Sequence, residues 1–229
     1  MELIPNGVAV PALQAEQTLA DRQAVRAELG LAPDALLVGS LTRAVPEKAL
    51  PVMLEAFARL SQRHDAYLLL VGEGVDSNNT ELQAQIAALQ LQNKVHSLGI
   101  RHDPQRLIRA FDIATLSSRS EAFPLFLVEA MALGVPCVAT DVGDIGVIFG
   151  GHGILVPTGN DERLAEAWQQ VLNWSQLERQ QQTEQAWAHI QANFSLERMQ
   201  QHHLKVFAEA IAACESSQAW NMRIHHKRC

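Results

Sequence analysis

Short apolar runs alternate along the chain with segments whose apolar residues recur at helical spacing. Strands are predicted at residues 36–41, 66–71, 95–98, 113–116, 136–139 and 154–156. Helices are predicted at residues 19–29, from 50 onward, around 82–89, at 104–110, at 124–133, from 161 onward, at 176–193 and at 195–213. Alternation of buried strands with helices is typical of a parallel sheet with right-handed crossovers and helices on both faces. The pattern therefore predicts an α/β fold.

The connection between the strands at 113–116 and 136–139 contains an almost wholly apolar helix. Pro124 suits the first turn, where its missing N–H costs nothing, and Gly134 followed by Pro136 ends the helix. Glu129 is the only charge on this helix. A carboxylate in apolar surroundings is unfavourable unless something hydrogen-bonds to it, so we expect Glu129 to meet a ligand. The alternative is a solvated Glu on an exposed edge.

A second acid, Glu121, lies in the turn that leads into this helix. Both carboxylates are expected to face the cleft above the helix N-terminus, where strand ends open. The first N–H groups, from about Phe123 to Phe126, have no partner within the helix and attract an anion. A ligand with a phosphate between two hydroxyl-rich groups fits all three features, and a nucleotide-sugar is such a ligand.

Composition narrows the classes of function. The chain has 229 residues, 48% of them hydrophobic, and a net charge of −7, which argues against a broad nucleic-acid surface. Its three cysteines and nine histidines show no metal-binding spacing, and no Asp-x-Asp occurs. No apolar run reaches the length of a membrane span. These features favour a protein of the reducing cytoplasm, with no metal site and no nucleic-acid partner.

Several motifs together resemble one known family. They are EAFP at 121–124, EAMA at 129–132, Gly134, Pro136 and ATDVG at 139–143. They are similar to the donor-site signature of retaining glycosyltransferases of family 4, and the likeness extends over about residues 4–207. The resemblance implies the C-terminal half of a GT-B fold, a Rossmann-like parallel sheet with helices on both faces plus C-terminal helices. It divides the chain into a linker (1–17), a nucleotide-sugar-binding domain (18–213) and a tail (214–229), which lacks periodicity and is expected to be disordered.

The resemblance also implies roles for individual residues. Arg43 and Lys48, in the turn after the first strand, would hold the donor's diphosphate together with the N–H groups around Phe123 to Leu125. Glu121 would hold the transferred sugar and Glu129 the ribose. The expected donor-binding residues are Arg43, Lys48, Gly72, Glu121, Ala122, Phe123, Pro124, Leu125 and Glu129, of which Arg43, Lys48 and Glu121 are expected to be catalytic.

Some positions allow a simpler interpretation or depart from the family pattern. The simpler interpretation of Arg43 and Lys48 is that they are two solvated surface cations. For Gly72 it is an ordinary turn after a strand. Thr42 and Ala49 stand where the family usually has glycines, so we expect a stiffer loop.

The resemblance implies hexosyltransferase-like transfer, without metal or cofactor, from a nucleoside diphosphate sugar to an unknown glycan or glycolipid acceptor. The acceptor would be bound by an N-terminal domain, in cis or as a second chain. The protein would be cytoplasmic, or peripheral to a membrane through that domain. The alternatives are a nucleotide-sugar-binding module without activity, one subunit of a two-chain enzyme, or a sugar-nucleotide epimerase of the same architecture.

Overall fold

Six parallel strands form one sheet in the order β3-β2-β1-β4-β5-β6. The computed structural model describes residues 4–225. The strands are β1 (Leu36–Leu41), β2 (Ala66–Val71), β3 (Val95–Ser97), β4 (Ile113–Leu116), β5 (Cys137–Thr140) and β6 (Ile154–Val156). The predicted α/β class is therefore confirmed. The strand bounds match the predictions except at β3, which ends one residue earlier, and β5, which is shifted by one residue.

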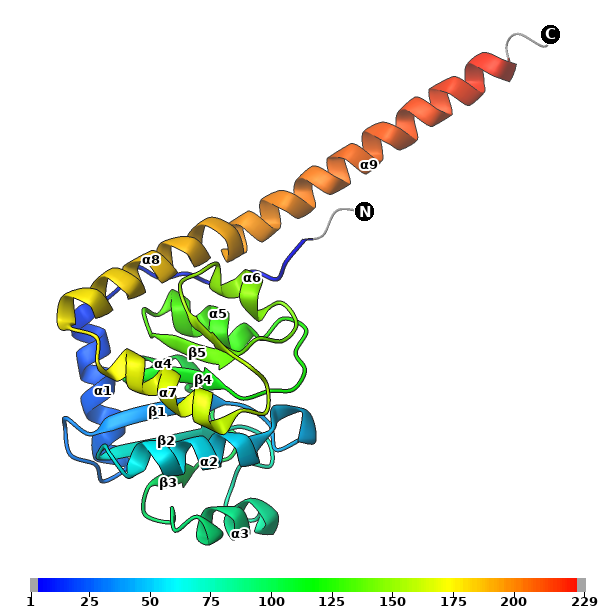
Figure 1. Cartoon of the computed structure of the whole chain (residues 1–229). Helices are drawn as coiled ribbons and strands as arrows, with labels where there is room; N and C mark the ends of the chain where they lie inside the picture. The colour runs from blue at the N-terminus through cyan, green and yellow to red at the C-terminus, as the bar shows by residue number, and fades with distance from the viewer. Residues whose placement is uncertain (1–3, 226–229) are drawn as a thin grey trace.

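Helices cover both faces of this sheet (Figure 1). They are α1 (Ala15–Glu28), α2 (Leu50–Ser61), α3 (Thr80–Ala88), α4 (Pro104–Ala110), α5 (Leu125–Ala132), α6 (Ile145–Phe149), α7 (Asp161–Leu172), α8 (Gln176–Phe194) and α9 (Leu196–His225). One core lies between the sheet and α1, α4, α5 and α8, and a second lies between the sheet and α2, α3 and α7. Leu37 and Leu69 point into the first core, whereas Val38 and Leu68 point into the second. Burial on both faces explains why the strands are continuous apolar runs.

Helices α1, α5 and α9 start at other residues than predicted, α9 by one residue, at Leu196. Helix α1 begins at Ala15 after the N-cap Gln14, so Thr18 lies inside the helix and does not cap it. The expected linker therefore ends before residue 15, because residues 15–17 form the first turn. Helix α5 begins at Leu125, with Pro124 as the N-cap residue in an extended conformation. Proline suits either place, because neither position needs its N–H group.

The N-terminal segment is fixed against the junction of α8 and α9. Val8 donates from its N–H to the carbonyl of Phe194 at 2.9 Å and accepts from the N–H of Leu196 at 2.9 Å. Farther along, the Trp187 indole donates to the carbonyl of Pro11 at 2.8 Å. The N-terminal segment therefore lies beside α8 and the start of α9.

Helix α9 projects away from the rest of the molecule (Figure 1). We expected disorder from residue 214, whereas α9 continues to His225; residues 226–229 lie outside the described residues, as do residues 1–3 of the expected linker. Leu204, Phe207 and Ile211 are 68%, 60% and 59% exposed and form an apolar stripe at helical spacing. Within residues 4–225, no helix combines the length and the apolar character needed to cross a membrane.

Candidate functional site

A cleft of about 400 Å³ opens at the carboxyl ends of β1, β2 and β4. The chain builds the sheet outward from β1 to β3 and then returns to place β4 on the other side of β1. Ligands of open α/β sheets bind at such a switch point. The cleft is lined by Leu41, Thr42, Arg43, Lys48, Val71, Gly72, Glu73, Ile100, Arg101, Pro104, Leu116, Glu121, Pro124, Leu125 and Phe126.

The loop between β1 and α2 supplies two of the cations. Arg43 is exposed, and no side chain in the described part of the chain pairs with its guanidinium group. The loop then forms a short 3₁₀ turn, Pro46–Lys48, and reaches Ala49 in the left-handed region with φ 47°. The hydroxyl of Ser117 holds this turn by donating to the carbonyls of Lys48 at 2.8 Å and Ala49 at 3.2 Å. The backbone that positions Lys48 is therefore anchored to the end of β4.

Lys48 and Glu121 form an ion pair in the cleft. Lys48 Nζ lies 2.5 Å from Oε1 of Glu121, and the Ser118 hydroxyl donates to the same oxygen at 2.6 Å. The Glu121 side chain is only 8% exposed and that of Lys48 is 17% exposed. Among the described residues, Oε2 of Glu121 has no partner. This carboxylate can therefore still accept a hydrogen bond from a ligand hydroxyl.

Gly143 explains how the turn that contains Glu121 is supported. It has φ 55°, and a Cβ atom there would lie 1.9 Å from the carbonyl oxygen of Glu121. Beside it, the N–H of Asp144 donates to the carbonyl of Ala122 at 3.1 Å. Only glycine allows the two loops to approach so closely.

Gly72 lines the cleft, and its backbone lies close to the carbonyl group of Thr42. A Cβ atom on Gly72, which has φ 139°, would lie 1.9 Å from the carbonyl oxygen of Thr42. The Thr42 N–H donates to Val71 at 2.8 Å, which continues the β1–β2 pairing into the loop. The glycine therefore fixes the position of the loop that precedes Arg43.

The N-terminus of α5 lies at the cleft. Pro124, Leu125 and Phe126 line the cleft, and the first N–H groups of a helix have no partner within it. The Phe123 ring instead packs against Phe194, with ring centroids 5.6 Å apart. Ala122 and Phe123 do not line the cleft, so the structure brings together only part of the segment expected to bind the donor.

Glu129 lies one turn into α5 and is half-buried. Its carboxylate has no hydrogen-bond or ion-pair partner among the described residues, and burial raises the pKa of Glu129. It is absent from the lining of the cleft, whereas Glu121 faces into it. The two acids therefore do not share this cleft.

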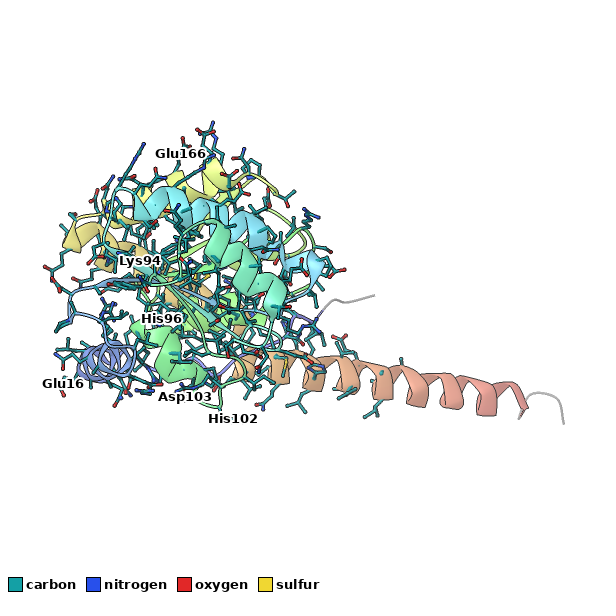
Figure 2. The ribbon with its side chains drawn as sticks, turned by 90° about the horizontal axis from the view of Figure 1, so that it is seen from below. Glu16, Lys94, His96, His102, Asp103 and Glu166 are labelled. Carbon is teal, nitrogen blue, oxygen red and sulfur yellow. The ribbon has the colours of Figure 1, made fainter. Side chains whose placement is uncertain are left out.

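The far wall of the cleft contains Arg101, which is not among the donor-binding residues expected from the sequence. Its guanidinium donates to both oxygens of Asp103, at 2.9 and 2.8 Å, and to Glu28 of α1 at 2.6 Å. The hydrogen bond from Arg101 lowers the pKa of Asp103 to about 2. In Figure 2, Asp103 lies at the start of α4 beside α1, which is viewed nearly end-on near Glu16. This ion-pair cluster connects α1 to the cleft wall, a contact that no local sequence pattern predicts.

In the part of the chain that the structure describes, no three His, Cys, Asp or Glu side chains are grouped as metal ligands would be.

Comparison with known proteins gives a consistent result. Residues 32–173 match the family described as glycosyl transferases group 1. N-acetyl-alpha-D-glucosaminyl L-malate synthase of Bacillus anthracis is 32% identical over 161 residues, which cover 69% of this chain and 42% of that protein. D-inositol 3-phosphate glycosyltransferase of Rhodococcus jostii is 35% identical over 185 residues, covering 74% of this chain and 40% of that protein. The chain thus spans about two fifths of the length of these relatives.

Solved structures share the fold. A glycosyltransferase from Rickettsia africae superposes with a TM-score of 0.82 at 24% identity, covering 92% of this chain and 57% of that one. HepE of Anabaena, in complex with UDP and glucose, superposes with a TM-score of 0.79 at 26% identity, covering 91% and 57%.

Proposed function

The chain belongs to the group 1 glycosyltransferase family, and we propose that it is the donor-binding half of a family 4 enzyme that transfers a sugar with retention and without a metal. Its sheet and helices have the Rossmann-like arrangement of GT-B glycosyltransferases, as do its structural neighbours. The proposal goes beyond that fold to the chemistry of the cleft.

One observation supports the proposal most directly. The β1–β4 switch point brings Arg43, Lys48 and the N-terminus of α5 to one cleft, together with the acid Glu121. A planar guanidinium, a compact ammonium and a row of N–H groups are complementary ways to bind phosphate oxygens. Within residues 4–225, the Arg43 guanidinium has no side-chain partner, so it can bind a diphosphate without first breaking an ion pair.

The acids are assigned to the hydroxyl groups of the donor. We propose that Oε2 of Glu121 accepts from a hydroxyl of the transferred sugar, and that Glu129 accepts from the ribose after a local adjustment that opens its surroundings. Because HepE was solved with UDP and glucose, UDP and UDP-glucose are the first ligands to test.

The transfer step depends on charge at the leaving group. As the bond from the sugar to the diphosphate breaks, negative charge grows on the diphosphate oxygens. Arg43, Lys48 and the α5 N–H groups would stabilise that charge without reorganising, an effect that is often the largest in enzyme catalysis. These groups supply the positive charge that a divalent cation provides in other enzymes, and metal independence is proposed on that basis.

The acceptor is proposed to bind against a second domain, because the matched relatives are more than twice as long as the segment aligned here. That domain would be joined in cis or present as a second chain, and the acceptor would be a glycan or a glycolipid. We propose that the enzyme works in the cytoplasm, at a membrane surface if the second domain binds there.

Calorimetry with UDP, GDP and ADP, each in the presence of EDTA, tests the proposal. We expect weak binding of at least one of them, reduced at least tenfold in Arg43→Ala. Arg63→Ala is the matched control, because Arg63 is also exposed but lies just before β2, at the opposite edge of the sheet. No heat from any of the three nucleotides would contradict the proposed function. Binding without transfer, even with the second domain supplied, would instead indicate a binding module without activity.

A further inference from the structure

We propose that Ser118 is a positioning residue, which fixes the carboxylate of Glu121 so that one oxygen faces the donor sugar. The inference rests on the proposed function and adds to it a residue that acts through Glu121 and touches neither the sugar nor the diphosphate.

The contact is short and entirely protected from solvent at the serine. Ser118 is 0% exposed, and its hydroxyl donates at 2.6 Å to Oε1 of Glu121. The final torsion of a Glu side chain is broad, so its carboxylate rotates readily unless a neighbour holds it. A hydroxyl on a buried backbone holds Oε1, which leaves Oε2 pointing elsewhere.

Ser118 is itself held from behind. The Thr140 hydroxyl, at the end of β5 and 1% exposed, donates to the Ser118 carbonyl at 2.6 Å, and the Thr158 hydroxyl reaches the same carbonyl at 3.3 Å. The preceding residue, Ser117, is hydrogen-bonded to the turn that presents Lys48. The two serines thus connect the cation and the acid of the cleft to one rigid strand end.

Lys48 also contacts Oε1 of Glu121, but unlike Ser118 it is expected to bind the donor as well. The Lys48 ammonium is the group proposed to bind the diphosphate, so it has two tasks once a donor arrives. Ser118 faces no such competition, because it is buried and, among the residues that the structure describes, its hydroxyl donates only to Glu121. In the loaded protein, Ser118 is therefore the donor that keeps Glu121 oriented.

The test compares how much the sugar contributes to donor affinity. Calorimetry gives the ratio of the Kd for UDP to the Kd for UDP-glucose or UDP-N-acetylglucosamine, whichever the wild type binds more tightly. Ser118→Ala is expected to lower this ratio about 3- to 10-fold, because a hydrogen bond to a charged group is lost, while the Kd for UDP changes less than twofold. In a Glu121→Ala background, Ser118→Ala is expected to have no further effect.

Ser40→Ala is the matched control. Ser40 is also 0% exposed and lies near a strand end, but its hydroxyl has no partner among the described residues. We expect this variant to leave the ratio unchanged and the stability unchanged or slightly higher. If Ser118→Ala folds poorly, Thr140→Val removes the hydroxyl that holds the Ser118 carbonyl and should lower the same ratio by a smaller factor.

The outcomes separate the inference from the function on which it rests. Ser118 has only a structural role if Ser118→Ala weakens the binding of UDP and of its sugar conjugate equally, or if its effect on the Kd ratio adds fully to that of Glu121→Ala. In that case the inference is wrong, while the proposed function still stands. If the wild type binds UDP but gains nothing from either sugar, the role of Glu121 fails and the inference fails with it. If the wild type binds no nucleotide at all, the proposed function itself is wrong.

Discussion

Lys48 and Glu121 lie 73 positions apart in the sequence, yet Nζ of one is 2.5 Å from Oε1 of the other. The cation proposed for the diphosphate and the acid proposed for the sugar are therefore paired with each other. If both proposed roles hold, Lys48 must contact the diphosphate and Glu121 the sugar of the same donor. The ion pair also compensates the charge of a nearly buried carboxylate.

Arg43 and Lys48 should differ in what their removal does to stability. Both Arg43→Ala and Lys48→Ala should weaken UDP binding at least tenfold, because each removes a charge-assisted contact to phosphate. Only Lys48→Ala should also lower the free energy of unfolding, by about 1–3 kcal/mol, since it leaves Glu121 without its counterion. Urea denaturation and calorimetry on both variants check this. Equal stability of the two variants would mean that the ion pair contributes nothing to folding.

Glu129 should destabilise the protein at neutral pH. Burial raises the pKa of Glu129, so the folded state holds its proton more tightly than the unfolded state does. The destabilisation is absent below the ordinary Glu pKa of about 4.3 and grows as the pH rises through the raised folded pKa. The free energy of unfolding of Glu129→Gln should therefore equal that of the wild type near pH 4 and exceed it at pH 7 by on the order of 1 kcal/mol. The variant should also bind UDP more weakly. Glu55→Gln, which makes the same substitution at an exposed position of α2, is the matched control.

Gly143 should be irreplaceable because of its contact with Glu121. Gly143→Ala should destabilise the protein by more than 2 kcal/mol, roughly the sum of a left-handed conformation and a steric clash, and should abolish donor binding. Gly159 is the matched control, since it has φ 72° but no atom within 4 Å of an added Cβ. Gly159→Ala should lose only about 1 kcal/mol and keep UDP affinity. Thermal unfolding and calorimetry on both variants check this. Similar losses of stability in the two variants would show that the loop around Glu121 can move to accommodate the added Cβ atom.

The 229-residue chain should bind a donor without transferring its sugar at a useful rate. Positioning an acceptor against the reacting carbon can account for roughly 7–11 kcal/mol of barrier reduction, and we propose that a second domain provides it. Slow hydrolysis of the donor by water should remain. Mass spectrometry of a panel of glycan and glycolipid acceptors checks this, and efficient transfer by this chain alone would place the complete active site within it.

The exposed stripe of α9 should promote self-association when no other domain covers it. Phe207→Glu should make the protein more monodisperse in sedimentation experiments, because it places a charge in the middle of the apolar stripe. Ala213→Glu adds a negative charge at an exposed position on the opposite side of the same helix and should have little effect. If the wild type is already monomeric at high concentration, the stripe is not a self-association surface.

The sequence by itself determined the class of fold. Continuous apolar runs such as 66–71 mark strands buried on both faces, and their alternation with helical spacing requires a parallel sheet. Local signals also placed the end of α5, because glycine and proline act on the backbone within a few residues. Glu129 and Glu121 were found from their places on and before an apolar helix, and Arg43 and Lys48 through the resemblance to a family signature; both are local patterns.

Only the tertiary structure decided which of these residues meet. The pairing of Lys48 with Glu121 and the approach of Gly143 to the Glu121 carbonyl each join different segments of the chain, and no sequence period predicts either contact. Ser118 and Glu121 are only three residues apart, but the conformation of their turn decides that the two side chains meet. The separation of Glu129 from the cleft likewise depends on how α5 packs between its neighbours. Periodicity reports which face of an element is buried, whereas contacts between loops depend on where the whole sheet places their ends.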